Sequence, residues 1–403
     1  MNPSDEERET EPATRATLRM VRQSPAPTDD SDARPALVVD TVGREREFAL
    51  LLSAWEAARD QRGRHLHVTA LAGIGKSRLL GDVHARLVAA RGKALLIRAN
   101  PGEHDLPYTL AATLATALAA LPGARGVSSA SAAALLALTP AVSSWIHGAA
   151  DPATGDEALR RRRIAVGELL ANVAAEHPVA VLVDDLHWAD ASSRQLLQGV
   201  AARCSGMSAL LVTASRPLTD AAAGDLPEEA LTLAAFKPSD VLELLARVGS
   251  LPDEPWALAL PDDLTRATGG SPLLVLETLH LLLERDALRL NADGWSVGAA
   301  DRLHDLLGAG SAISRRLEQL SRPEFWLLLL LATSGTPVPT AALASMSAVL
   351  EGETLETLGV LERRGLVTSA GGRWQSAHDE ISEQVPAVTP PDARRAAHLA
   401  IAR

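Results

Sequence analysis

A glycine-rich segment near residue 70 constrains what this chain can fold into more than any other feature. Its sequence is Ala70-Leu71-Ala72-Gly73-Ile74-Gly75-Lys76-Ser77. A short apolar stretch, His65–Leu71, leads into it, and an amphipathic stretch, Lys76–Ala90, follows it. Glycines let backbone N–H groups turn inward around phosphate oxygens, while a lysine reaches the β- and γ-phosphates and a hydroxyl binds Mg²⁺. The order strand, loop, helix therefore predicts a phosphate-binding loop, in which Ala70 stands in place of the usual first glycine.

Two carboxylates follow a second apolar run further along the chain. Val179–Asp184 is apolar up to its last residue, and Asp185 comes directly after it. A carboxylate at the end of a buried strand is costly unless a cation or hydrogen bonds compensate it, and in phosphate-loop proteins this position holds Mg²⁺. We therefore predict that Asp184, with Ser77, holds Mg²⁺ and that Asp185 orients or deprotonates the attacking water. The alternative is that Asp185 only caps the next helix, with Asp190 as a rival cap.

Alternating apolar and amphipathic stretches predict the architecture around these motifs. Strands are expected at His65–Leu71, Lys93–Arg98, Val179–Asp184, Ala209–Ala214 and Ala230–Leu233. Helices are expected at Lys76–Ala90, Pro107–Leu121, Ser128–Ala149, Ala158–Ala175 and Ser192–Cys204. Apolar runs without polar alternation, separated by helices, indicate a parallel sheet that is covered on both faces. The fold class predicted for residues 36–235 is an α/β doubly wound parallel sheet.

The remaining chain divides into segments of different character. Residues 1–35 are polar and proline-rich, and they predict a disordered leader. Residues 236–313 predict a small all-helical lid, because no further strand is expected directly after Phe236. Residues 314–385 combine helices with a two-stranded hairpin around Gly371-Gly372, which describes a winged helix, and residues 386–403 begin a helical extension that is cut off.

Composition excludes several classes of protein. The formal net charge is −11, which argues against a free-standing nucleic-acid binder, and Cys204 is the only cysteine, which excludes a disulfide framework and favours a reducing cytoplasm. The longest apolar runs, Phe325–Ala332 and Leu110–Leu121, are well short of the roughly 20 residues that a membrane-spanning helix needs. We therefore expect a soluble protein of the cytoplasm without a membrane partner.

Five motifs together resemble a known family. They are Val42-Gly-Arg-Glu-Arg-Glu47, Gly73-Ile-Gly-Lys-Ser-Arg-Leu79, Val183-Asp-Asp-Leu-His-Trp-Ala-Asp190, Ser215-Arg-Pro217 and Thr268-Gly-Gly-Ser-Pro272. This order is similar to that of the STAND-class AAA-like ATPases, which include the regulatory ATPase modules of large bacterial LuxR/MalT-type transcription regulators. The resemblance spans about Val42 to Arg403, and the run from Val183 to Asp190 is its most specific part.

The resemblance implies roles for individual residues. Val42, Gly43 and Arg44 resemble the segment that packs beside adenine and ribose, and Ala72 to Arg78 resemble the phosphate loop. Arg216 resembles the polar residue that senses the γ-phosphate, although a solvated strand-end arginine is the alternative. Pro272 resembles the lid proline that lies against adenine, but a first-turn helix proline fits equally. His378 resembles the histidine that touches the ADP β-phosphate, and a packed or capping histidine is the alternative.

These features lead to three functional hypotheses. The first is a switch driven by ATP and ADP with Mg²⁺, with slow hydrolysis, closed by ADP and opened by ATP for self-association or contact with a protein partner. The second is a DNA-acting ATPase resembling replication initiators. Glu353, Glu356 and Glu362 on the expected recognition helix would repel phosphates, so we do not expect DNA as a partner of this segment. The third is a nucleotide-dependent scaffold without turnover. In the family, helical repeats and an output domain follow this module, so either the chain is truncated or those domains belong to another polypeptide.

Overall fold

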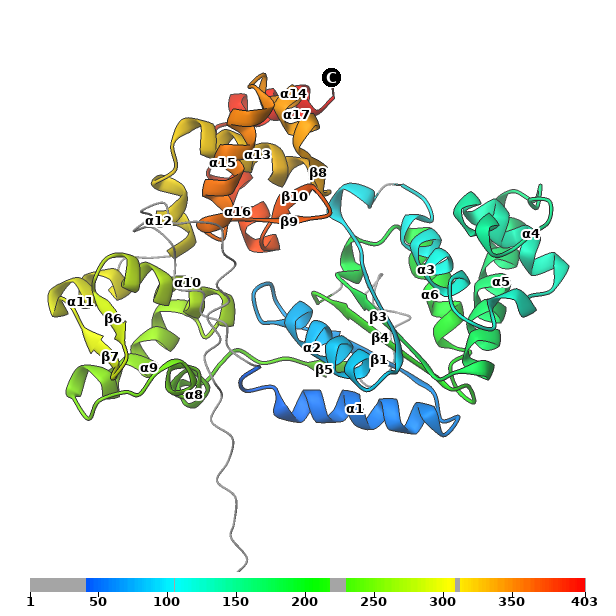
Figure 1. The fold of residues 1–403 in the computed structure, drawn as a ribbon, viewed down its shortest axis with the longest axis horizontal. Helices are drawn as coiled ribbons and strands as arrows, with labels where there is room; N and C mark the ends of the chain where they lie inside the picture. The colour runs from blue at the N-terminus through cyan, green and yellow to red at the C-terminus, as the bar shows by residue number, and fades with distance from the viewer. Residues whose placement is uncertain (1–40, 105, 218–229, 309–311, 403) are drawn as a thin grey trace, which may run out of the picture.

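The structure is a computed structural model of the 403-residue chain, and it describes residues 41–104, 106–217, 230–308 and 312–402. The predicted leader, residues 1–35, lies outside the described residues. The elements gather into three units with separate apolar cores, arranged around the glycine-rich loop (Figure 1). We call them the sheet unit (β1–β5 with α1–α6), the middle unit (α8–α11 with β6 and β7) and the C-terminal unit (α12–α17 with β8–β10).

The sheet unit is built on five parallel strands in the order β2-β3-β4-β1-β5. Their bounds are β1 Arg64–Thr69, β2 Lys93–Arg98, β3 Val179–Asp184, β4 Ala209–Ser215 and β5 Ala230–Thr232. The predicted α/β fold with a central parallel sheet is therefore confirmed. The first strand ends two residues earlier than predicted, at Thr69, because Ala70 and Leu71 already turn into the loop, and the fifth ends one residue earlier, at Thr232.

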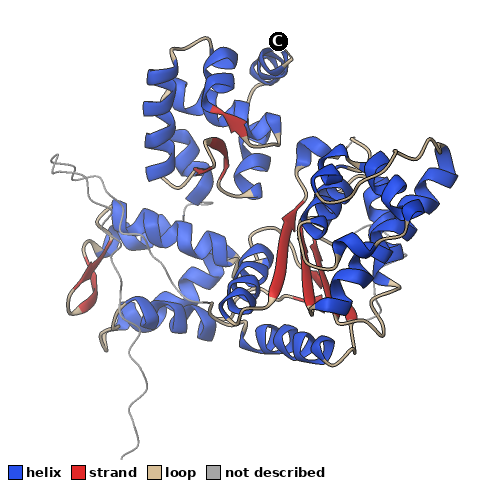
Figure 2. Ribbon diagram, turned by 45° about the vertical axis from the view of Figure 1, so that its right-hand side comes forward, coloured by secondary structure: helices blue, strands red, loops and turns tan. Residues whose placement is uncertain are grey.

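Helices cover both faces of this sheet (Figure 2). Their bounds are α1 Glu45–Arg59, α2 Lys76–Ala89, α3 Thr109–Ala119, α4 Ser129–Leu138, α5 Gly155–Glu176 and α6 Ala191–Ala201. Every residue of strand β3 is buried, so both faces of the sheet must be covered. Val181 packs with α3, α5 and α6 on one face, and Leu182 packs with α1 and α2 on the other. The single helix predicted for residues 128–149 stops at Leu138, and a short 3-10 helix, Pro140–Ser144, replaces its second half, because a proline cannot donate a backbone hydrogen bond to a continuing helix.

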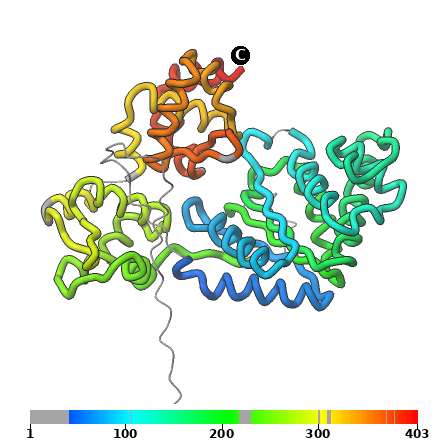
Figure 3. The backbone as a smooth tube through the Cα atoms, viewed as in Figure 1, coloured from blue at the N-terminus to red at the C-terminus, as the bar shows by residue number. Residues whose placement is uncertain are grey.

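The middle unit follows β5 along the chain (Figure 3). Its helices are α8 Pro238–Val248, α9 Pro255–Thr268, α10 Pro272–Glu284 and α11 Ala300–Gly308. The prediction that this unit is all-helical is wrong, because β6 (Leu288–Asn291) and β7 (Gly294–Val297) form an antiparallel hairpin. Gly294 adopts φ +112°, a conformation in which a side chain would collide with the Ser250 carbonyl oxygen. The Asp293-Gly294 pair is a known hairpin signal, and Trp295 of β7 is buried in the core of the unit.

The C-terminal unit packs around α13, whose leucines form the centre of its core. Its helices are α12 Ala312–Glu318, α13 Arg322–Ser334, α14 Thr340–Ser347, α15 Glu351–Arg363, α16 Asp379–Val388 and α17 Pro391–Ile401. Three short antiparallel strands, β8 Val338–Pro339, β9 Val367–Ala370 and β10 Arg373–Ser376, are ordered β8-β10-β9. The hairpin predicted around Gly371-Gly372 is present as β9 and β10.

None of the helices in the described ranges is long and apolar enough to cross a membrane.

Candidate functional site

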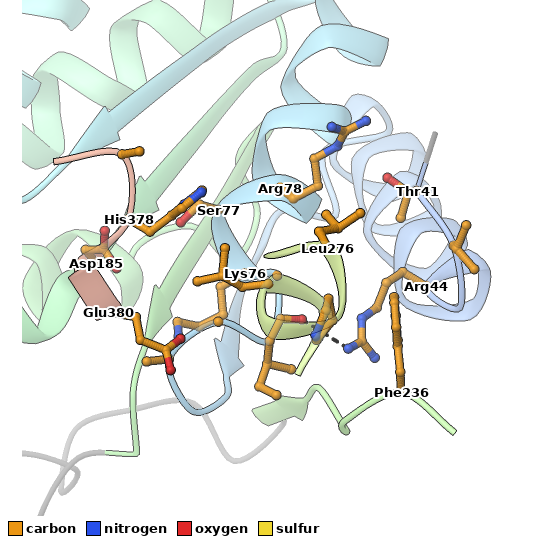
Figure 4. Close-up of a pocket in the computed structure, with 18 of the residues that line it drawn as sticks. Thr41, Arg44, Lys76, Ser77, Arg78, Asp185, Phe236, Leu276, His378 and Glu380 are labelled. Carbon is orange, nitrogen blue, oxygen red and sulfur yellow. Dashed lines mark hydrogen bonds between the residues drawn. The ribbon is translucent and has the colours of Figure 1, made fainter. Parts of the chain in front are cut away.

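Because the strands are parallel, their carboxyl ends meet at one edge, and β4 lies between β1 and β3. The glycine-rich loop after β1, Arg216 after β4 and Asp185 after β3 therefore converge there. A cavity of about 480 Å³ opens at this edge (Figure 4). It includes the predicted residues Val42, Arg44, Ala72, Gly73, Ile74, Gly75, Lys76, Ser77, Arg78, Asp185, Arg216, Pro272 and His378. Gly43 and Asp184, also predicted, are not among its lining residues.

The loop has the backbone geometry that a phosphate group requires. Gly73 and Gly75 adopt φ +73° and +100°, in the left-handed region that glycine occupies without strain. Gly75 is the N-cap of α2, so no side chain bonds the first N–H groups of that helix, and its first turn holds no acidic residue. Nothing lies within 4 Å of where a Cβ on Gly75 would be. An uncapped helix N-terminus facing open space fits a bound phosphate.

The basic and hydroxyl groups of the loop are close to this helix end. Lys76 is buried, and its Nζ donates hydrogen bonds to the carbonyl oxygens of Ala70 (2.9 Å) and Leu71 (3.0 Å). Ser77 and Arg78 are exposed toward the cavity, and Arg78 Nε donates to Asp82 Oδ2 at 2.9 Å. The side chains that phosphate binding requires are therefore all present at one helix N-terminus.

The two carboxylates after β3 have different surroundings. Asp184 is buried, and its Oδ1 accepts a hydrogen bond from the backbone N–H of Asp185 at 2.9 Å. Asp185 is also buried, at φ +53°, and its Oδ2 accepts from Arg98 Nε at 2.7 Å. Burial raises the pKa of the Asp185 carboxyl, and Asp184 raises it further, while Arg98 and Lys76 oppose the rise. Arg98 therefore favours the charged form of the carboxylate that was predicted to position water.

The question of which residue caps the following helix is settled. Asp190 is the N-cap of α6, and its Oδ1 accepts hydrogen bonds from the backbone N–H groups of Ser193 and Tyr108, both at 2.9 Å. Asp185 makes no side-chain capping bond to the short 3-10 helix that follows it, Leu186–Trp188. The capping alternative for Asp185 is wrong, so its carboxylate is available for a role at the cavity.

The N-terminal segment joins the sheet unit to the middle unit. Val42 is buried in the apolar core of the middle unit. Arg44 is buried as well, and its guanidinium donates to the carbonyl oxygens of Ile74 (3.1 Å) and Ala234 (2.5 Å) while lying 5.6 Å from the centre of the Phe236 ring. A Cβ on Gly43 would lie 3.1 Å from Asp240 of α8. One arginine thus fixes a carbonyl of the phosphate loop and an aromatic ring in the cavity wall.

The first turn of α10 contacts the phosphate loop directly. The backbone N–H of Leu273 and the hydroxyl of Ser271 donate to the carbonyl oxygen of Gly73, at 3.2 and 3.4 Å. Pro272 occupies the first position of α10 and also lines the cavity, so the structure is compatible with both of its interpretations. The conformation of the loop at Gly73 therefore depends on the middle unit as well as on the sheet.

The C-terminal unit reaches the same cavity through the start of α16. His378 is the N-cap residue of α16 but makes no side-chain capping bond, and its exposed ring lines the cavity, so the capping alternative is wrong. Arg216, half-buried after β4, forms an ion pair with Glu383 of α16. This pair rules out the alternative of a merely solvated arginine. A second contact joins the two units, from Gly102 N–H to the Gly335 carbonyl at 3.2 Å.

A buried polar network lies behind the cavity, between β1 and β4. The Oγ1 atom of Thr213 contacts His65 Nε2 at 2.8 Å and His67 Nδ1 at 2.9 Å, and Ser215 Oγ contacts His67 Nε2 at 3.1 Å. Burial lowers the pKa of both histidines to about 4, and for His65 the neighbouring ring adds to this. The Ser215 hydroxyl also donates to the carbonyl oxygen of Arg216 at 2.6 Å, so the network reaches the backbone of that residue.

Among the residues of the cavity wall that were not predicted from the sequence, three carry a charge or an aromatic ring. Arg98 ends β2, the strand beside β3. A charged residue at the end of an apolar strand indicates a site residue for Arg98 as it does for Asp184. Phe236 is one of only three phenylalanines in the chain, which makes its position next to a strand end notable. Glu380 follows His378 by two residues, but nothing in a single sequence indicates that it points to the phosphate loop.

The site also fits a metal ion that is held mainly by the phosphates of a bound nucleotide. In the described part of the chain, no three His, Cys, Asp or Glu side chains gather into a metal site. Mg²⁺ is usually bound by one or two protein side chains together with substrate phosphates and water, rather than by a complete protein cage. The Ser77 hydroxyl in the first turn of α2 and the Asp184 carboxylate at the end of β3 are the donors that such a site needs.

Comparison with known proteins decides the family of the sheet unit. Residues 41–212 match the family model described as an AAA ATPase domain. These residues form an AAA-like P-loop ATPase domain. The match implies nucleotide binding by this AAA domain, and its limits enclose the phosphate loop, Arg98 and Asp184-Asp185.

One curated relative and two solved structures extend over more of the chain. An uncharacterized protein of Rhizobium meliloti (strain 1021) is 33% identical over 273 residues, which are 62% of this chain and 26% of the relative. A Signal Transduction ATPase with Numerous Domains (STAND) protein from Pyrococcus horikoshii, with a tetratricopeptide repeat sensor, aligns with a TM-score of 0.52 at 14% identity. That alignment covers 93% of this chain and 46% of the Pyrococcus chain. Drosophila ORC bound to DNA aligns with 93% of this chain and 96% of its own at 14% identity, but its TM-score of 0.42 is too low to support an argument.

The Pyrococcus alignment shows a shared fold, and the Rhizobium and Pyrococcus alignments also show that the chain is shorter than both of these proteins. The Pyrococcus structure shares the fold across the AAA domain, the middle unit and the C-terminal unit. The chain spans about a quarter of the length of the curated relative and about half of the length of the Pyrococcus chain.

Proposed function

We propose that this protein is a STAND-type regulatory switch that binds ATP or ADP with Mg²⁺, hydrolyses ATP slowly and acts in signal transduction linked to transcription regulation. The observation that carries the proposal is the composition of the cavity wall. Residues of the AAA domain, the middle unit and the C-terminal unit line one cavity at the phosphate loop. A ligand in this cavity would contact all three units at once, so its chemical state would influence how they are arranged.

Each predicted residue has a place in this proposal. The backbone of Ala72–Ser77 and the Lys76 ammonium hold phosphates, and Ser77 and Asp184 hold Mg²⁺, which supplies positive charge to the phosphate groups. Asp185 orients the attacking water, and its ion pair with Arg98 favours the ionised form that this role needs. Val42, Arg44, Phe236 and Pro272 surround the base and ribose, while Arg216 and His378 report the state of the phosphates.

The units around the AAA domain have mechanical roles in this proposal. The middle unit is the lid, and the C-terminal unit is a winged helix that closes over the nucleotide rather than reading DNA. The observed arrangement corresponds to the closed state, held by the contacts Leu273–Gly73, Arg216–Glu383 and Gly102–Gly335. Opening these contacts would free surfaces for self-association or for a protein partner. In the Pyrococcus protein the sensor is a tetratricopeptide repeat, and a sensor of that kind is the input we propose here.

The proposal is tested by nucleotide binding and by shape. We expect the purified chain to bind ATP and ADP in calorimetric titrations, and Lys76→Ala to weaken both by at least about tenfold, because the phosphate charge loses its point-charge partner. Arg86→Ala, on the exposed side of α2, is the matched control and should bind as the wild type does. Small-angle scattering should give a larger radius of gyration with an ATP analogue than with ADP. Failure of the wild-type chain to bind either nucleotide would reject the proposal.

A further inference from the structure

An acidic side chain from the C-terminal unit faces the phosphate loop. Glu380 lies in the first turn of α16, and Figure 4 shows its carboxylate on the loop side of the cavity. A Cβ built on Gly73 would lie only 2.7 Å from Glu380 Oε2. That oxygen is buried, and no group in the described part of the chain hydrogen-bonds to it. A buried carboxylate oxygen without a donor is costly, so its position against the loop requires an explanation.

The surroundings of Glu380 are those of an anion site. The glycine loop and the uncapped N-terminus of α2 attract negative charge, and Arg216, which also lines the cavity, interacts electrostatically with Glu380. The first turn of α2 contains no acidic residue of its own. The carboxylate that faces this loop therefore belongs to another unit, at the start of α16. Glu380 therefore stands against the glycine loop whose lysine, Lys76, reaches the β- and γ-phosphates of a bound nucleotide.

The neighbouring carboxylate on α16, that of Glu383, already has an ion-pair partner. Glu383, one turn further along α16, is paired with Arg216, whereas Glu380 Oε2 has no such partner. Burial raises the pKa of Glu380, and the neighbouring Glu383 raises it further, while Arg216 opposes the rise. A further negative charge placed beside Glu380 would interact with it across a short distance in a partly desolvated site, where like charges repel strongly.

We propose that Glu380 is the residue that makes the closed cavity select a nucleoside diphosphate over a triphosphate. In the closed arrangement its carboxylate stands against Gly73, so a γ-phosphate would bring negative charge next to negative charge. A diphosphate leaves that space to the carboxylate and keeps α16 in place. A triphosphate displaces Glu380 and, with it, the start of α16 and its Arg216–Glu383 pair. This inference rests on the proposed nucleotide switch, and it names Glu380 as the group that makes the closed state favour ADP over ATP.

The test compares diphosphate and triphosphate binding by the full 403-residue chain. Dissociation constants for ADP and for a non-hydrolysable ATP analogue, both with Mg²⁺, are measured by calorimetry for the wild type and for Glu380→Gln. We expect the wild type to prefer ADP, and Glu380→Gln to reduce that preference about tenfold or more, mainly by tighter binding of the triphosphate analogue. Glu353→Gln, an exposed glutamate on α15, is the matched control for loss of one charge and should leave the ratio unchanged.

The outcomes separate this inference from the proposed function. If the wild type binds both nucleotides but Glu380→Gln leaves their ratio unchanged, the inference is overturned and the switch is not. If Glu380→Gln weakens binding of the triphosphate analogue, Glu380 assists triphosphate binding, and the inference is equally overturned. If the wild type binds neither nucleotide, both fail. Glu380→Ala removes the charge together with the side-chain volume and should change the ratio in the same direction, and circular dichroism melts verify that both variants fold.

Discussion

Arg98 and Asp185 form an ion pair at the carboxyl edge of the sheet, with Arg98 Nε 2.7 Å from Asp185 Oδ2. Arg98 ends β2, and Asp185 directly follows the last residue of the neighbouring parallel strand β3, so the strand pairing itself brings the two side chains close together. Since Asp185 is buried and follows another carboxylate, this arginine is the main group that lowers its pKa against the effects of burial and of Asp184.

The first prediction concerns the pH dependence of ATP hydrolysis. Replacing Arg98 by methionine removes positive charge beside a carboxyl whose pKa burial already raises, so that pKa should rise further. If ionised Asp185 positions the water, the acid limb of the kcat–pH profile should move to higher pH by about one unit or more. Arg98→Lys keeps the charge and should leave the limb close to the wild-type position. An acid limb that stays in place in Arg98→Met would contradict the role given to Asp185.

The second prediction concerns the contact between Gly102 and Gly335. A Cβ on Gly102 would lie 2.6 Å from the Ser334 carbonyl oxygen, so Gly102→Ala should force the sheet unit and the C-terminal unit apart. We expect a larger radius of gyration by small-angle scattering and faster ADP release, both in the direction of the open state. Gly352→Ala on α15 is the control, because nothing lies within 4 Å of its added Cβ. Equal ADP release from Gly102→Ala and from the wild type would show that this contact does not hold the closed state.

The third prediction concerns acid stability and the two buried histidines. The unfolded chain takes up a proton on each ring near pH 6.5, but His65 and His67 in the fold do so only near pH 4. Between these values the unfolded state binds more protons, so the free energy of unfolding is largest above pH 6.5 and falls as pH falls toward 4. His67→Asn should reduce the loss between pH 7 and pH 4.5 by about 2 kcal/mol, measured by urea unfolding at each pH. His104→Asn removes an exposed ring and is the control, and an equal loss in His67→Asn would refute the assignment.

The fourth prediction concerns the ion pair between α10 and α12. Glu277 and Arg316 are both buried, and Arg316 also donates to the carbonyl oxygen of Arg364. Removing one partner leaves an uncompensated buried charge, so Arg316→Met should lower the free energy of unfolding by about 3–5 kcal/mol. The double variant Glu277→Leu/Arg316→Met should regain most of that loss, because it removes both charges together. Thermal unfolding of the two single variants and the double variant gives the coupling, and independent, additive effects would mean that the pair does not couple the units.

Much of the AAA domain could be predicted from the sequence because its strands are short apolar runs. Val179–Asp184 and Lys93–Arg98 match the observed strands at both ends: every residue of β3 is buried, and β2 is an apolar run between two exposed basic residues, Lys93 and Arg98. The glycines, lysine and serine of the phosphate loop could also be predicted, because the residues that bind phosphate lie within a few positions of one another in the sequence.

What the sequence did not reveal depends on contacts between distant residues. Arg98 and Asp185 are 87 positions apart, and Arg216 and Glu383 are 167 apart, so neither pair has a local pattern. Glu380 lies against Gly73 but belongs to a third unit, and only the packing of α16 brings the two residues together. The β6–β7 hairpin was missed for a different reason: its strands are four residues each, too short for a convincing alternation, and only the Asp-Gly turn marks them.

The two hydrogen bonds to the Gly73 carbonyl have a consequence for how this protein is dissected. A fragment that ended at Phe236 would retain all five strands and the helices on both faces, and it would pass as an intact domain in most folding assays. Yet it would lose Ser271 and Leu273, and with them the donors that hold one peptide of the phosphate loop. Affinities measured on such a fragment would describe an unsupported loop, so a unit that keeps the native support of the loop at Gly73 must extend at least through α10.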